Sequence, residues 1–336
     1  MTICIKRARR RRVRNTNRIL RGMFTLVLMI LVSPLVSCVP SMGDSTSTPA
    51  ATATSTLSPI VTLTNTENAP TQTLTPTPPT GPAVLVGAGD ISVCDNDNDE
   101  LTAQLLDAIS GTVFTTGDNA YDDGTASQYA DCYHPTWGRH KDRTKPVPGN
   151  HEYHTADAAG YFQYFNNISP YYAYDLGSWR IYALNSEIEV SEDSPQVQWL
   201  QADLAANPKQ CVLAYWHQPR WSSGSRHGND RSVRTLWRIL YEAGAELVIN
   251  GHEHNYERFA PMNATGEADP LGLREIVVGT GGKSLYEFGR PLPTSEVRAD
   301  GTFGVLKLTL HHTHYEWEFI PVQGSTFTDS GSTECH

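Results

Sequence analysis

The chain has 336 residues and a formal net charge of −10 at pH 7, with 26 Lys and Arg against 36 Asp and Glu. Residues 1–37 hold nine of the basic side chains and no acid, so the remainder has 17 basic against 36 acidic side chains. This acidity argues against a protein that binds nucleic acid, because phosphate backbones require clustered Lys and Arg. It remains compatible with a small anionic substrate held by metal ions.

Residues 1–37 have the pattern of an export signal. A basic segment precedes residues 23–36, an apolar run with three interruptions. This run is shorter than the roughly 20 residues of a membrane span and suits a signal peptide. Residues 35–38, Leu-Val-Ser-Cys, resemble a bacterial lipobox. We therefore expect Cys38 to be lipidated as the first mature residue and to anchor the protein at the cell envelope or surface. The alternative is an uncleaved anchor with an incidental cysteine.

Residues 38–82 are predicted to form a disordered linker. The stretch 41–82 contains 13 Thr, 5 Ser and 7 Pro among its 42 residues, which leaves almost nothing to bury. The folded part then covers residues 83–336, and about 250 residues can form a single catalytic domain.

From residue 83 onward, apolar runs that end in polar turns alternate with helical patterns. This alternation predicts an α/β or mixed layered fold. Helices are expected at residues 99–109, 194–206 and 230–243. Strands are expected at residues 83–88, 112–116, 145–148, 171–176, 179–185, 211–216, 246–249, 274–278, 304–310 and 315–321.

Polar motifs follow directly after five of these strands. Sites in α/β sheets form outside the carboxyl ends of strands, so the motifs are expected to converge. In chain order they are Gly89-Asp90, Gly117-Asp118-Asn119-Ala120-Tyr121, Gly149-Asn150-His151-Glu152, Ala214-Tyr215-Trp216-His217 and Gly251-His252-Glu253-His254. This series resembles the five ordered motifs of calcineurin-like metallophosphoesterases. Many members carry a histidine two residues after the first aspartate. Ser92 stands there in this chain, so Tyr121 is the expected replacement ligand and the chain resembles the purple acid phosphatase branch.

The resemblance implies a four-layer αββα sandwich with two mixed sheets and a binuclear metal centre. In such a centre a metal-bridging hydroxide attacks phosphorus. Asp118 is the expected bridging ligand. A hard, phenolate-containing set suited to Fe(III) consists of Asp90, Tyr121 and His254. A neutral set suited to Fe(II), Zn or Mn consists of Asn150, His217 and His252.

Two histidines are candidates for work on the substrate. His151 follows Asn150 and is the expected proton donor to the leaving group, oriented by Glu152. His227 lies ten residues after His217, where family members place substrate-contacting histidines. The function implied is hydrolysis of small phosphomonoesters, as in acid phosphatases. The alternatives are a phosphodiesterase or nucleotide hydrolase with the same centre, and an inactive metal-binding surface module.

Four cysteines of the folded part, in an exported chain, favour disulfides with three possible pairings. Cys94 and Cys132 both follow strand ends that should converge, so we predict that they pair and, by elimination, that Cys211 pairs with Cys335.

Three further stretches have unexceptional interpretations. A calcium loop that began at Asp95 would need glycine at its sixth position and an acid at its twelfth, where Glu100 and Leu106 stand. Residues 95–100 are therefore expected to form a turn that enters a helix. Residues 279–283 lack P-loop spacing and indicate a structural turn that borders the site. His311, His312 and His314 are expected to be surface residues, because they alternate along a strand.

Overall fold

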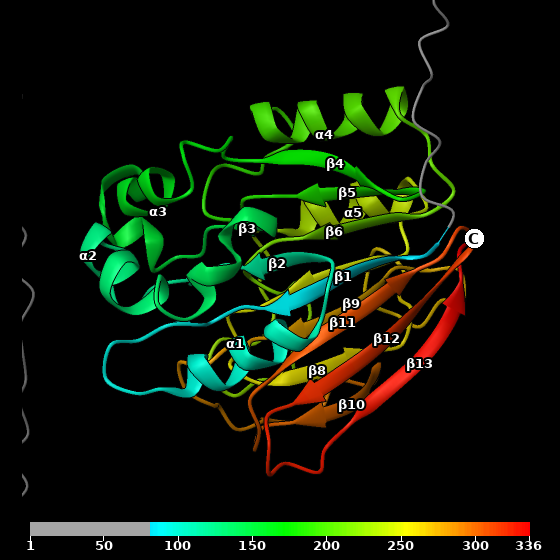
Figure 1. Ribbon diagram of the computed structural model, residues 1–336. Helices are drawn as coiled ribbons and strands as arrows, with labels where there is room; N and C mark the ends of the chain where they lie inside the picture. The colour runs from blue at the N-terminus through cyan, green and yellow to red at the C-terminus, as the bar shows by residue number, and fades with distance from the viewer. Residues whose placement is uncertain (1–80) are drawn as a thin grey trace, which may run out of the picture. The chain divides into compact units, whose positions relative to one another are not determined.

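The computed structural model describes residues 81–336, so the predicted signal peptide, Cys38 and almost all of the predicted linker lie outside the described residues. Two mixed β-sheets form the centre of the domain (Figure 1). The six-stranded sheet has the order β13 (Asp329–Glu334), β12 (His314–Pro321), β11 (Gly304–Leu310), β1 (Ala83–Ala88), β2 (Thr112–Thr116) and β3 (Thr144–Val147). The seven-stranded sheet has the order β10 (Ser295–Ala299), β8 (Tyr256–Phe259), β9 (Arg274–Val278), β7 (Leu247–Asn250), β6 (Val212–Tyr215), β5 (Trp179–Ala183) and β4 (Tyr172–Leu176).

The strands that lead to the motifs are parallel within each sheet. In the first sheet β1, β2 and β3 run parallel, and in the second sheet β5, β6, β7 and β9 do so. The remaining neighbours are antiparallel. The motifs that follow β1, β2 and β3 therefore share one sheet edge, and those that follow β6 and β7 share another.

Helices connect and cover the sheets. They are α1 (Asn98–Ala108), α2 (Ala126–Gln128), α3 (Ala159–Tyr164), α4 (Pro195–Ala206) and α5 (Arg234–Glu242). The described residues also form one π-helix, η1 (Tyr129–Tyr133), and three 3-10 helices, η2 (Trp137–Arg143), η3 (Glu152–His154) and η4 (Ala156–Ala158). Within residues 81–336, none of the helices is both long and apolar enough to span a bilayer.

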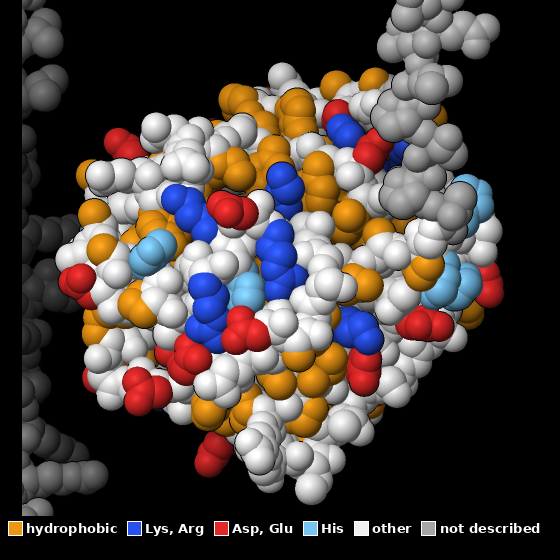
Figure 2. Space-filling view, in the orientation of Figure 1, with side chains coloured by type: hydrophobic (Ala, Val, Ile, Leu, Met, Phe, Trp, Pro, Cys, Tyr) orange, Lys and Arg blue, Asp and Glu red, His pale blue; other side chains and the backbone are white. Residues whose placement is uncertain are grey.

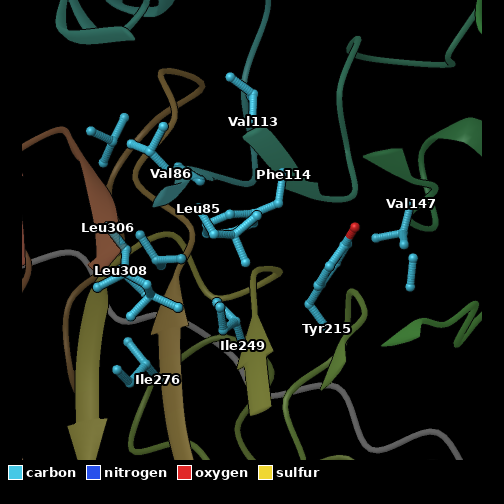
Figure 3. Packing of buried hydrophobic residues seen from close by; sticks show 14 of the residues in the cluster. Leu85, Val86, Val113, Phe114, Val147, Tyr215, Ile249, Ile276, Leu306 and Leu308 are labelled. Carbon is cyan, nitrogen blue, oxygen red and sulfur yellow. The ribbon is translucent and has the colours of Figure 1, made fainter. Parts of the chain in front are cut away.

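Side chains of the seven-stranded sheet alternate between two cores. Ile249 and Ile276 face the other sheet and share one buried cluster with Leu85 and Phe114 (Figure 3). Val248 and Val277, each next to one of these isoleucines in the chain, point the opposite way, into a second cluster with α4 and α5, as does Ala214. On the outer side of the six-stranded sheet, α1 packs against β11. The expected four-layer sandwich of two mixed sheets is confirmed.

The structure corrects several predicted elements. Strands β8, β10 and β13 were not predicted, and β10 and β13 are polar edge strands without apolar alternation. The helix expected at 230–243 is too long, since α5 covers Arg234–Glu242. At its start the Asp230 carboxylate accepts the Ser232 N–H at 2.7 Å, a turn that competes with helix.

Both predicted disulfides are present. Cys94 and Cys132 are joined with their Cα atoms 5.1 Å apart, and Cys211 and Cys335 are joined with theirs 5.6 Å apart. The first pair links the segment after β1 to η1, and the second links the residue before β6 to the residue after β13. Each cross-link restricts the unfolded chain and so stabilises the fold.

Candidate metal centre

All seven predicted ligand side chains are neighbours in space. Each follows the carboxyl end of a strand: Asp90 follows β1, Asp118 and Tyr121 follow β2, Asn150 follows β3, His217 follows β6, and His252 and His254 follow β7. The contacts described below join them into one cluster. The structure thus brings the predicted set together, while metal binding by each residue stays a prediction.

The turns that carry these ligands have unusual backbone geometry. The φ angle is 59° at Asp90, 50° at Asp118 and 68° at His252. Non-glycine residues rarely adopt such angles, and those that do concentrate at functional sites. Gly149 leaves room for the central carboxylate, because a Cβ atom there would lie 2.3 Å from Asp118 Oδ1.

The Tyr121 hydroxyl lies at the centre of the first half of the cluster. It is 2.8 Å from Asp90 Oδ1, 2.8 Å from Asp118 Oδ2 and 3.1 Å from His254 Nε2. A phenol has one proton and can donate to one of these three atoms. His254 Nε2 can itself donate to the phenol oxygen, so one of the two carboxylate contacts is left without a proton, as expected where a cation binds.

His217 is the corresponding group in the second half. Its Nδ1 is 2.8 Å from the carbonyl oxygen of Thr116, which can only accept, so Nδ1 carries the proton. In the neutral ring, the form that binds a metal ion, Nε2 presents a lone pair 3.1 Å from Asn150 Oδ1, 3.1 Å from His252 Nδ1 and 3.2 Å from Asp118 Oδ2. Asp118 Oδ2 thus contacts both halves, as a bridging ligand must.

The pKa values of the cluster indicate a site that favours a cation. Burial opposes ionisation of Asp118, but His217 beside it holds the pKa of that carboxyl below its usual range. Burial lowers the pKa of His217, yet the contact with Asp118 prevails and raises it to about 10. Burial, Asp118 and Asp90 raise the pKa of Tyr121 well above its ordinary value. A phenolate there therefore requires a bound cation.

The donor atoms fit two metal ions. Lone pairs of carboxylate, amide, phenol and imidazole converge at separations of 2.8 to 3.2 Å. Two atoms that bind one octahedral cation at about 2.0–2.2 Å, at right angles to each other, lie roughly 3 Å apart. The first half offers mainly oxygen atoms and the second mainly nitrogen atoms, which suits a hard and a softer ion respectively.

The structure places His151 beside the cluster but corrects the expected role of Glu152. His151 Nδ1 donates to the Asp122 carbonyl at 2.5 Å, and its Nε2 lies 3.9 Å from Asp118 Oδ2. Glu152 does not orient this ring. It is fully buried and accepts from five donors of other residues: the N–H groups of Asp118, Asn119, Ala120 and Gly149 and the hydroxyl of Tyr129. Glu152 therefore holds the turn that carries Asp118.

His227 also reaches the cluster, from an exposed loop. Its ring centroid is 4.0 Å from that of His252. Three buried carboxylates hold the backbone of this loop, residues 220–228. Glu275 accepts the N–H groups of residues 220 and 221, Glu257 that of residue 223, and Glu253 those of residues 227 and 228.

The glycine-rich turn at 279–283 leads to residues that contact the cluster and that the sequence did not indicate. Ser284 Oγ lies 2.9 Å from His254 Nδ1, and Tyr286 stacks on the His254 ring at 3.9 Å. Lys283 Nζ is 4.8 Å from the Tyr121 ring and 2.7 Å from Asp122 Oδ1. The glycines were the only available signal, since a Cβ at Gly279 would lie 2.7 Å from Asp90 Oδ2.

Two facing mixed sheets with this ligand cluster at their strand ends define a metallophosphoesterase. A profile of the calcineurin-like phosphoesterase family matches residues 84–256, just over half of the chain. The protein belongs to this family.

Purple acid phosphatases are among its relatives. Purple acid phosphatase 21 of Arabidopsis thaliana is 30% identical over 241 residues, which are 61% of this chain and 55% of the relative. Probable inactive purple acid phosphatase 1 of the same plant is 24% identical over 289 residues, 71% of this chain and 46% of the relative. The purple acid phosphatase PPD1 of yellow lupin (Lupinus luteus) seeds shares the fold, with a TM-score of 0.64 and 20% identity over 77% of this chain and 55% of that one. The chain spans about half the length of the curated relatives it matches. This fold implies a binuclear metal centre.

Proposed function

We propose that the protein is a binuclear metal-dependent hydrolase of small phosphomonoesters, of the acid phosphatase type. The observation that supports this most strongly is the cluster of seven donors whose lone pairs face one another around Asp118. Two bound cations would supply Lewis acidity toward the phosphoryl oxygens and would activate water. Fe(III) would be held by Asp90, Tyr121 and His254, and Fe(II), Zn or Mn by Asn150, His217 and His252.

Two imidazoles of the chain flank the place where a substrate phosphate would bind. The His151 ring lies 4.3 Å from the Tyr121 ring, on the Fe(III) side, and His227 lies against His252 on the other side. Because His151 Nδ1 is engaged with the Asp122 carbonyl, Nε2 is the atom that would carry a proton to the leaving oxygen. His227 would hold a non-bridging oxygen of the phosphate.

Turnover of three substrates by the metal-loaded full chain tests this proposal. We expect a higher kcat/KM for p-nitrophenyl phosphate than for bis(p-nitrophenyl) phosphate or ATP. A preference for the diester or for ATP would contradict the monoester assignment and retain the metal chemistry. Bound metal without turnover of any of the three would support an inactive surface module instead.

The metal assignment has its own measurement. Elemental analysis should find iron, and the visible spectrum should contain a broad tyrosinate-to-iron band. Tyr121→Phe should abolish this band, whereas Tyr286→Phe, a control on a tyrosine that stacks against His254 without joining the ligand set, should retain it. Absence of iron and of the band from the active enzyme would contradict Fe(III) at Tyr121.

We further propose the arrangement of the whole chain. Residues 1–37 would be removed as a lipoprotein signal peptide, Cys38 would carry the lipid, and residues 38–82 would hold the catalytic domain of residues 83–336 away from the envelope. The sequence patterns at 23–38 and 41–82 support this arrangement. Cys38→Ala should release the protein from the membrane fraction, and Cys4→Ala should not. Unchanged fractionation of Cys38→Ala would favour an uncleaved anchor.

A further inference from the structure

A second group of ligand-type side chains lies on the hairpin between β11 and β12. His311 and His314 stack with ring centroids 4.0 Å apart and planes 9° apart, and Glu316 follows in β12. One ligand atom from each of the three lies within 4.8 Å of the others. The expected alternation along a strand does not apply here, because the chain turns at residues 311–313 and brings both rings to one side.

This group is remote from the metal centre. Ala83 at the start of β1 pairs with Leu310 at the end of β11, so the hairpin lies at the amino end of β1. Asp90 lies beyond the carboxyl end of that strand. At about 3.3 Å per residue, roughly 20 Å of β1 separate the two places. The hairpin therefore cannot contribute to the proposed phosphatase site.

The backbone of the hairpin is fixed before any ligand binds. His311 donates its N–H to the His314 carbonyl at 2.9 Å, which closes the turn. The His311 carbonyl accepts from Trp179 Nε1 at 2.7 Å. The Thr313 carbonyl accepts the N–H of Cys335 at 2.7 Å. Cys335 forms a disulfide with Cys211, the residue before β6. Rigid support of this kind lowers the entropic cost of holding several ligands around one ion.

One donor atom in the group has no partner. His311 Nε2 is shielded from solvent and makes no hydrogen bond among the described residues. Its nearest carboxylate oxygen, Glu316 Oε1, is 3.7 Å away, which is beyond hydrogen-bond distance. Two atoms that each bind one tetrahedral cation at about 2.0–2.2 Å lie roughly 3.5 Å apart. The separation therefore fits an ion between imidazole and carboxylate better than a direct contact.

We propose that His311, His314 and Glu316 bind one divalent transition-metal ion of the Zn²⁺ type. Two imidazoles and one carboxylate are ligands that Zn²⁺ prefers, and Cu²⁺ and Ni²⁺ share this preference. His311 and His314 line a cavity of about 800 Å³, together with Gly81, Pro82 and Lys209. Figure 2 shows a group of His side chains at one edge of the molecule. The ion would thus lie close to Gly81 and Pro82, the first residues that the structure describes.

Metal content of the full chain tests the proposal. The metal centre is first loaded, the protein is dialysed against Zn²⁺, and bound zinc is counted and titrated by calorimetry. The wild-type chain should bind one more Zn²⁺ than His311→Ala or His314→Ala, and Glu316→Gln should bind it more weakly. His312→Ala is the matched control on the same turn and should bind as the wild type does.

Two results would overturn the proposal: equal zinc content in the wild type and both histidine variants, or loss of the ion in His312→Ala alone. A second readout guards against a folding defect of the variants. Added Zn²⁺ should raise the Tm of the loaded wild type and of His312→Ala but not of His314→Ala. Phosphatase activity should be equal in all of them, so failure of the proposed function leaves this test intact.

Discussion

Two of the loops at the candidate metal centre differ in how they are held. Residues 117–121 carry buried Asp118 and Tyr121, and one carboxylate, Glu152, accepts three backbone N–H groups of this turn. Residues 220–228 carry exposed Arg226 and His227. Three different carboxylates accept hydrogen bonds from the backbone N–H groups of this loop.

Under the proposed function, the first loop would bind metal and the second would contact the substrate. Metal ligands must keep a fixed geometry around an ion. In the first loop this geometry is provided by burial and by the hydrogen bonds that the Glu152 carboxylate accepts. Groups that meet a substrate must remain accessible, so their loop lies at the surface and its support comes from below. Loss of support should therefore be severe for the first loop and mild for the second.

The largest effect is expected for Asp118→Asn, which removes the charge shared by both halves of the centre. Since metal ions contribute several kcal/mol to such reactions, kcat should fall by more than about a thousandfold. Elemental analysis should find less metal at both sites. The matched control Asp123→Asn, on an exposed carboxylate nearby, should keep both metal and activity. Full metal occupancy with activity retained in Asp118→Asn would rule out the bridging role.

Glu152→Gln should have the next largest effect. The new amide points an N–H group at the N–H groups of the turn, and an unsatisfied buried polar group costs about 1–3 kcal/mol. The free energy of unfolding should fall by about that amount, and metal content should fall with it. Glu257→Gln, the same change below the second loop, should lower stability without loss of metal. Equal metal loss in both variants would show that the two loops are not supported differently.

His151→Ala should change leaving-group dependence more than overall stability. General acids contribute about 10²–10⁴-fold, and mainly where the leaving oxygen is a poor leaving group. We expect about a hundredfold lower kcat on alkyl phosphates and a small change on activated aryl esters. His154→Ala is the control, since its Nδ1 contacts the same Asp122 carbonyl from an exposed position. Equal losses on both substrate types would contradict proton donation.

The sequence was sufficient to predict the strands that lead to the candidate ligands, because buried parallel strands consist of nearly continuous apolar residues. It also predicted the disulfides, since Cys94 and Cys132 follow strand ends of one sheet. Motif position could not show where a side chain points. Glu152 directly follows His151, yet its carboxylate turns inward to the backbone of residues 118–120.

Residues on polar loops were predicted least well. Ser284 and Tyr286 support His254 from a loop that has neither periodicity nor a metal-binding pattern. The stacked pair His311 and His314 was assigned to a strand surface, because residues 311–314 contain none of the residue types that usually indicate a turn. Both failures have one physical reason: contacts between loops depend on tertiary packing and not on local preference.

The smallest effect is expected for Glu253→Gln, which weakens one of the three supports below residues 220–228. Its Oε1 accepts both N–H groups at 2.6 Å, and the amide oxygen of glutamine can replace it only as a neutral acceptor. KM should rise by a few fold, with kcat nearly unchanged, because His227 is displaced but the ligands are not. If Glu253 acts through His227, then Glu253→Gln should have no further effect on KM in a His227→Ala background. Additive effects of the two substitutions would mean that Glu253 acts on the neighbouring ligands His252 and His254 instead, and the separation between the two loops would fail at this residue.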